Sequence, residues 1–146
     1  MVHVEPMERD ADSFEFALAA KKEALGPHIT RRWGWDEGLQ RKTHSERWQA
    51  KHFFRIIREG VAIGTVAIDD APDHLRVGEF YLLSTFQGKG IGSEVLTMIL
   101  RDADSKHLPV RLECLKWNPA LRFYKRHGFV VTHESEAHFF MERPSR

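Results

Sequence analysis

Three glycines occupy alternate positions, 88, 90 and 92, in the stretch FQGKGIGSEVL, residues 86–96. The stretch begins where an apolar segment ends, and it continues into a run with apolar residues at helical spacing. Glycines at the start of a helix leave consecutive backbone N–H groups exposed, and the helix dipole favours an anion beside them. The stretch therefore predicts a binding site for a phosphate group.

Two common phosphate-binding loops differ from this stretch in detail. The nucleotide-binding loop requires Gly-Lys followed by Ser or Thr, whereas Lys89 is followed by Gly90. The dinucleotide-binding loop requires G-x-G-x-x-G, whereas the spacing here is G-x-G-x-G. The phosphate ligand therefore belongs to another class.

The elements that position this loop follow from the spacing of the apolar residues. Runs rich in β-branched and aromatic residues predict strands at residues 2–6, 52–58, 61–68, 75–83, 109–115, 129–134 and 137–142. Helical spacing predicts helices at residues 12–25, 36–48, 92–105 and 119–127. The order β-α-α-β-β-β-α-β-α-β-β indicates an α/β domain with a mixed sheet, and the length suits one domain over residues 1–146.

Short local signals indicate where the elements begin and end. Asp12 begins a pattern that resembles a capping box, the apolar stripe that follows includes Lys21, and Gly26-Pro27 is expected to end this helix. Glu59-Gly60 between two strands predicts a hairpin. Asn118 followed by proline favours the start of the last helix.

The composition excludes several classes of function. The 22 basic and 21 acidic residues interleave along the chain, which argues against a nucleic-acid partner. The single cysteine, Cys114, permits no intrachain disulfide. No apolar run is long enough to cross a bilayer, and the N-terminus lacks the pattern of a signal peptide, so a cytoplasmic protein without membrane contact is expected. Whether it is a monomer or a homodimer stays open.

The glycine loop and a second block together resemble one family. The letters QGKGIG place Gln87, Gly90 and Gly92 in the pattern Q/R-x-x-G-x-G/A, directly after the apolar segment EFYLL. The block NPALRFYKRHGF, residues 118–129, resembles the Asn…Tyr…Gly-Phe segment of the same family. The chain thus resembles the GNAT superfamily of acetyl-CoA-dependent N-acetyltransferases. The resemblance implies a central mixed, mostly antiparallel sheet flanked by helices.

The resemblance also implies how acetyl-CoA binds. The strand before the glycines separates from its neighbour, so that the pantetheine arm pairs with the backbone of Leu82 and Leu83, while Asn118 reaches it from the other side. The pyrophosphate is expected on the loop formed by Gln87, Gly88, Lys89, Gly90, Ile91, Gly92 and Ser93. No metal is expected, because His133 and His138 lie five positions apart rather than the four of the zinc-protease helix.

Two residues are implied as catalytic. Tyr124 matches the tyrosine that protonates the leaving thiolate, although the interval from Asn118 is one residue shorter than the commonest spacing. Glu79, the only acidic residue in the strand at 75–83, is the first candidate for the base that the amine requires. Side chains alternate between the two faces of a strand, and this alternation places Glu79 on the face opposite to the usual position of the base unless a bulge intervenes. Tyr81 and His138 therefore stay as alternatives.

The acceptor is expected to be an amine of a small molecule or peptide. Trp33, Trp35, Glu37 and His138 are the candidates for its pocket, since flat apolar walls with negative charge suit a cationic amine. The tryptophans could instead pack the second helix onto the sheet. The predicted function is direct transfer of the acetyl group to a primary amine in a ternary complex. A non-catalytic module that binds or senses acyl-CoA on the same fold is the alternative.

Overall fold

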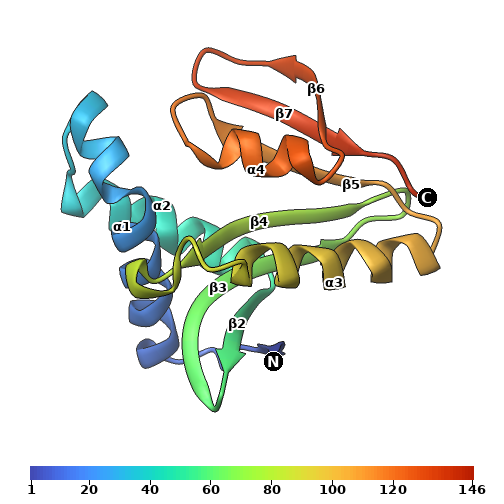
Figure 1. The fold of residues 1–146 in the computed structure, drawn as a ribbon. Coiled ribbons are helices and arrows are strands. Elements are labelled where there is room, and N and C mark those ends of the chain that lie inside the picture. The colour runs from blue at the N-terminus through green and yellow to red at the C-terminus, as the bar shows by residue number, and fades with distance from the viewer.

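A seven-stranded sheet forms the centre of the computed structural model, which describes all of residues 1–146 (Figure 1). Its strands are β1 (Val2–Pro6), β2 (Phe53–Arg58), β3 (Val61–Asp70), β4 (Leu75–Leu82), β5 (Val110–Leu115), β6 (Val130–Glu134) and β7 (His138–Arg143). Their spatial order is β1-β2-β3-β4-β5-β7-β6, and every neighbouring pair is antiparallel except β4 and β5. The mixed, mostly antiparallel sheet predicted from the sequence is confirmed.

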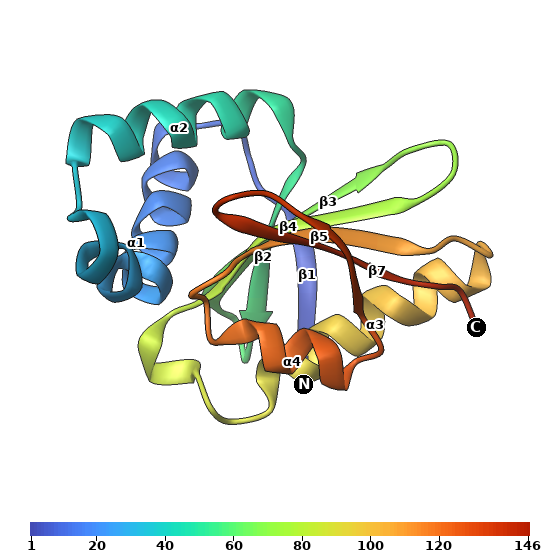
Figure 2. The same ribbon diagram turned by 90° about the horizontal axis from the view of Figure 1, so that it is seen from above.

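Four α-helices cover the two faces of this sheet. They are α1 (Ala11–Trp33), α2 (Glu37–Ala50), α3 (Ile91–Ser105) and α4 (Ala120–Arg126), and a short 3-10 helix, η1 (Ser84–Phe86), follows β4. Figure 2 shows α1 and α2 on one side of the sheet and α3 and α4 on the other. The element order agrees with the prediction from the sequence. None of the helices has the length and apolar character that spanning a membrane requires.

The first helix departs from its predicted bounds at both ends. Asp10, not Asp12, caps it, because the Asp10 carboxylate accepts a hydrogen bond from the backbone N–H of Ser13. Pro27 lies inside the helix, which continues to Trp33 and ends at Gly34 with φ 75°. A proline inside a helix removes one hydrogen bond and crowds the carbonyl four residues earlier, which costs about 3 kcal/mol. Continued burial of apolar side chains on both sides of Pro27 holds the helix together across it.

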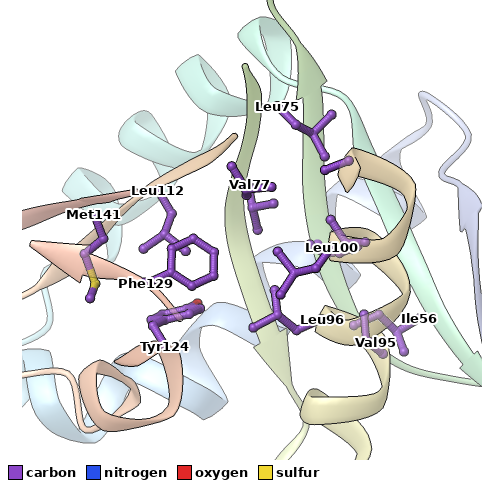
Figure 3. Packing of buried hydrophobic residues seen from close by; sticks show 14 of the residues in the cluster. Ile56, Leu75, Val77, Val95, Leu96, Leu100, Leu112, Tyr124, Phe129 and Met141 are labelled. Carbon is purple, nitrogen blue, oxygen red and sulfur yellow. The ribbon is translucent and has the colours of Figure 1, made fainter. Parts of the chain in front are cut away.

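The main core lies between the sheet and the α3–α4 layer (Figure 3). The apolar stripe of α3 packs on the strands, and Tyr124 and Phe129 join it from the α4 side. Val95 and Leu96 of α3 and Ile56 of β2 are fully buried. On the opposite face, a smaller cluster around Trp48 and Phe53 fixes α2 to the sheet.

Strand β4 contains one extra residue relative to β3. Thr65 pairs with Tyr81 but Ala67 pairs with Gly78, so β4 bulges between these pairs, and Glu79 adopts φ +47° there. The extra residue of a bulge shifts the alternation of side chains between the two faces by one position. It places Glu79 on the same face as Gly78, toward α2, where Arg47 contacts its carboxylate. The bulge on which the sequence-based assignment of Glu79 depended is therefore present.

The bulge also explains a glycine in the neighbouring strand. A Cβ atom on Gly64 of β3 would overlap the backbone carbonyl oxygen of Tyr81. The obstacle is backbone rather than a flexible side chain, so the two strands would have to move apart to accept it. Gly64 therefore permits the close approach of β3 and the bulged part of β4.

We expect Gly64→Ala to destabilise the fold by about 2 kcal/mol or more, as overpacking of a tight contact does. Gly38→Ala in α2 is the matched control, because its Cβ would meet only ordinary contacts and alanine favours a helix by about 0.5–1 kcal/mol. Urea unfolding of both variants measures the difference. An unchanged midpoint for Gly64→Ala would contradict the close approach described here.

Candidate active site

The site forms where β4 and β5 separate. The two strands pair only at Leu75 with Val110 and at Arg76 with Arg111, and beyond these pairs they diverge (Figure 1). Two cavities lie at the divergence, one of about 680 Å³ beside the glycine loop and one of about 320 Å³ beside α1 and α2. We call them the loop cavity and the helix cavity. Leu25, Tyr81 and Asn118 line both, so the two cavities meet at these residues.

The glycine loop forms one end of the loop cavity. Gly88 and Gly90 have φ values of 72° and 80°, which favour glycine, and both line the cavity. The first intrahelical bond of α3 runs from Glu94 N–H to the carbonyl of Gly90, so the N–H groups of residues 91–93 have no acceptor within the helix. These free donors at a helix N-terminus match the phosphate site predicted from the sequence.

Not every predicted loop residue contributes its side chain. Lys89 is exposed and does not line the loop cavity, and the side chain of Ile91 packs in the core. Gln87 and Ser93 line the cavity, and the Ser93 hydroxyl lies 2.8 Å from Nε2 of His127. Only the backbone of residue 91 is therefore available to a ligand, whereas Ser93 could contribute through both its backbone and its hydroxyl.

The edge of β4 differs from the prediction at one of its two residues. The N–H of Leu83 donates to the carbonyl of Ile63 at 2.9 Å, and its own carbonyl accepts from the N–H of Phe86. Leu83 therefore faces β3 and η1 and has no N–H left for a ligand. Backbone groups alternate in direction along a strand, so those of Leu82 point toward the divergence. The Leu82 carbonyl accepts a hydrogen bond from Nε2 of Gln87 at 2.9 Å.

A carboxylate from α1 fixes the start of the loop. Glu23 accepts hydrogen bonds from the backbone N–H of Ser84, at 3.0 Å, and from its hydroxyl. This contact fixes η1 against α1, although the two helices are far apart in the sequence. It was not foreseen from the sequence, because a single exposed glutamate carries no local signal of a partner 61 positions away.

The α4 segment forms the opposite wall of the loop cavity. The Asn118 side chain accepts from the N–H of Ala120 at 2.9 Å, so it caps α4 as predicted and still lines both cavities. Tyr124 packs its ring against Phe123. On its other side it packs against Phe129 (Figure 3). Burial raises the pKa of the Tyr124 phenol well above its ordinary value, and the hydroxyl makes no hydrogen bond within the protein. Tyr124 is thus a protonated donor at the cavity wall.

Glu79 lies in a cluster of charges at the helix cavity. Its carboxylate is 3.2 Å from Nη1 of Arg47 and accepts a hydrogen bond from the Tyr81 hydroxyl at 2.8 Å. Burial opposes its ionisation, but the positive charges of Arg47, Lys21 and Lys51 outweigh that effect and lower the pKa of Glu79. Glu79 is therefore ionised at neutral pH. Two alternatives for the base, Glu79 and Tyr81, form one hydrogen-bonded pair.

The predicted acceptor residues divide into two groups. Trp33 and His138 line the helix cavity, whereas Trp35 and Glu37 do not. The indole N–H of Trp35 donates to Glu37 at 2.7 Å, and Lys22 lies 3.4 Å from the same carboxylate, so this pair is occupied on the outer surface. The structure therefore does not bring Trp35 and Glu37 together with Trp33 and His138 at this cavity.

The helix cavity also differs in charge from the prediction. The charged residues that line it are the four cations Lys21, Arg47, Lys51 and Arg76 and the two carboxylates Glu79 and Glu113. The cavity is therefore basic rather than acidic. No three His, Cys, Asp or Glu side chains gather closely enough to hold a metal ion.

The comparisons with known proteins agree with this geometry. Residues 19–129 match the family model described as the acetyltransferase (GNAT) family. No curated protein matches the chain.

Solved structures share the fold at low sequence identity. The PaiA N-acetyltransferase from Thermoplasma acidophilum, in complex with coenzyme A, is 16% identical with a TM-score of 0.78, and the match covers 99% of each chain. The ribosomal-protein-S18-alanine N-acetyltransferase from Escherichia coli is 14% identical with a TM-score of 0.70, over 100% of this chain and 96% of that one. An acyl-CoA N-acyltransferase from Pseudomonas aeruginosa is 18% identical with a TM-score of 0.63, over 98% and 99%. With the family model matching most of its length, the chain belongs to the acetyltransferase (GNAT) family.

Proposed function

We propose that the protein transfers the acetyl group of acetyl-CoA to a primary amine by direct attack in a ternary complex. One observation carries this proposal: a cavity with free helix N–H donors meets a second, charged cavity at Tyr81 and Asn118. A ligand in each cavity would bring two reacting groups together there. Holding two reactants in contact removes much of the entropic barrier to their reaction.

The backbone donors of the loop cavity support acetyl-CoA as its ligand. The N–H groups of residues 91–93 would bind the pyrophosphate, and the outward backbone of Leu82 would pair with the pantetheine arm. The positive φ values of Gly88 and Gly90 turn the chain so that its backbone can approach a phosphate closely. When bound, acetyl-CoA supplies an activated acetyl group as a thioester.

Tyr124 would donate the proton that the departing thiolate sulfur requires. Its raised pKa keeps the phenol protonated at neutral pH, and its hydroxyl is not engaged by any other group of the protein. A thiolate that accepts a proton as it departs is a better leaving group.

Glu79 and Tyr81 would together accept the proton of the amine. A carboxylate with a lowered pKa is a weak base by itself, and Glu79 is buried away from the loop cavity. Tyr81 lines both cavities, and its hydroxyl already donates to Glu79. Its oxygen can accept a proton from the amine while its own proton moves to Oε2 of Glu79, so the tyrosine remains neutral.

Cys114 gives no support to a covalent route through an acetylated cysteine. Burial raises the pKa of its thiol to about 11, and its Sγ lies against the backbone carbonyl of Leu115. A nucleophilic cysteine needs a substantial thiolate fraction near neutral pH. This environment favours direct attack by the amine.

Acetyl-CoA should raise the melting temperature by about 5–10 °C at a hundred times its dissociation constant, given that such binding stabilises by about 2.7 kcal/mol. Gly90→Ala should reduce this shift, because a side chain strains the backbone at φ 80° beside the phosphate. Gly60→Ala is the control, since it carries the same strain at φ 77° in the β2–β3 hairpin, away from the cleft.

The same protein should release coenzyme A from acetyl-CoA only when an amine is present. If acetyl-CoA does not raise the melting temperature, its assignment as the cofactor is wrong. A large shift with no turnover across a broad amine panel would favour the binding or sensing module instead.

Tyr124→Phe should lower kcat by about 100-fold, the usual contribution of a positioned general acid, with little change in the acetyl-CoA thermal shift. The raised pKa of Tyr124 adds a pH criterion: the wild-type rate should not fall between pH 7 and about 9, because the phenol stays protonated there. Steady-state kinetics over this range measures both effects. An unchanged kcat in Tyr124→Phe would remove the general-acid role.

Glu79→Gln should lower kcat by about 10- to 100-fold at every pH between 6 and 9, without moving the rising limb set by ionisation of the amine. The rising limb should not move because the lowered pKa of Glu79 leaves its carboxylate ionised throughout this pH range. Glu134→Gln, an exposed position on β6, is the control. Tyr81→Phe should reproduce the loss if the proton passes through the hydroxyl. A loss in Glu79→Gln alone would show that Tyr81 is not in the path.

A further inference from the structure

The charges of the helix cavity identify the chemical class of the acceptor. We propose that the acceptor is a small amine that also carries an anionic group, a carboxylate or a phosphate, which binds at Lys21 and Lys51. This inference rests on the proposed acetyl transfer and names the kind of amine that the site accepts. It replaces the cationic acceptor that the tryptophan and acidic stretch suggested.

Lys21 is the first observation that supports an anion. It lies on the inner face of α1 and is only 5% exposed, yet it lines the helix cavity. Its ammonium group has no hydrogen bond and no carboxylate within ion-pair distance, and burial lowers its pKa. Desolvating an ammonium that makes no direct ion pair is costly, so its retention at the cavity wall points to a partner that arrives with the substrate.

The neighbours of Lys21 add more positive charge than negative charge. Arg47 of α2 and Lys51, which follows the last residue of that helix, both act on Glu79, so with Lys21 this single carboxylate faces three cations. The other carboxylate of the cavity, Glu113, is 2.6 Å from Arg76 and is already paired. The cavity thus holds two positive charges in excess, whereas the whole chain carries a net charge of only +1.

Gly78 leaves room for one of these cations. A Cβ atom at this position would stand 3.0 Å from Nζ of Lys51, so the ammonium lies directly over the strand. Gly78 and Lys51 both line the helix cavity. The absence of a side chain at Gly78 therefore leaves the sheet surface open below Lys51.

The two ends of the site fit an acceptor with two opposite charges. Tyr81 and Glu79 would receive the amine and its proton, as proposed above, while Lys21 and Lys51 would hold the anionic group. The cavity volume of about 320 Å³ lies at the small end of the range for ligand sites. A small amino acid or an aminoalkyl phosphate fits such a volume better than a folded protein surface does.

Matched pairs of amines test the proposal. Alanine is compared with alaninamide, and phosphoethanolamine with ethanolamine, by the rate of coenzyme A release from acetyl-CoA. Each pair differs in whether the second group is anionic, and kcat/KM is expressed per neutral amine because the anionic group also raises the pKa of the amine. We expect the anionic member to have a kcat/KM at least 10-fold higher in one pair, and the pair that responds shows whether the site takes a carboxylate or a phosphate.

The same rates are measured in Lys21→Met and in Lys21→Gln, so that one misfolded variant does not decide the result. Both should lose the preference for the anionic amine while keeping the acetyl-CoA thermal shift. Lys22→Met is the matched control, because Lys22 lies on the same helix, is exposed and does not line the cavity. It should keep the wild-type preference.

The outcomes separate this proposal from acetyl transfer itself. Equal turnover of charged and neutral amines, unchanged in Lys21→Met, would overturn the anionic acceptor while leaving the acetyltransferase intact. If no amine is acetylated, calorimetry with coenzyme A-saturated protein still decides. Binding of alanine or phosphoethanolamine that is lost in Lys21→Met would support the anion subsite without the transfer activity. Absence of such binding would overturn the subsite.

Discussion

The divergence of β4 from β5 is the constraint on which the site depends. Parallel strands that stop pairing after two residue pairs leave backbone groups without partners, and such groups are costly when buried. The structure satisfies one of them locally, because the Leu82 carbonyl accepts a hydrogen bond from the Gln87 side chain. The remaining edge borders a cavity. A ligand with peptide-like amides is the natural partner for such an edge.

The bulge in β4 sets what lies on each side of this divergence. Without it, alternation would turn Glu79 toward the apolar core between the sheet and α3. With it, Glu79 meets Arg47 and Tyr81 on the α2 side, while Phe80 still packs against the core. Gly64 of β3 lets the backbone of Tyr81 approach closely from the neighbouring strand. One inserted residue thus directs Glu79 to the charged α2 side of β4 and Phe80 to its apolar core side.

Features that depend on neighbours in sequence could be predicted, and those that depend on distant contacts could not. The Glu59-Gly60 turn, the Asp36 and Asn118 caps and the glycine loop are local, and the structure contains each of them. The end of α1 was wrong because packing around Pro27 outweighed a local signal for a helix end. Sequence alone could not show that Trp35 and Glu37 pair with each other outside the helix cavity, because their direction depends on where α2 begins relative to the sheet.

Lys21 shows how a departure from a pattern can be used. The sequence places a lysine within the apolar stripe of the first helix. Its long aliphatic stem can pack there, and only its ammonium group needs polar surroundings. In the structure the nearby opposite charge is Glu79, which also interacts with Arg47 and Lys51. Glu79 lies beyond ion-pair distance from Lys21. A hydrophobic residue of similar size would satisfy the same packing without desolvating a charge. A position that sacrifices stability in this way is explained more simply by ligand binding than by folding, because folding alone gives no reason to keep the charge.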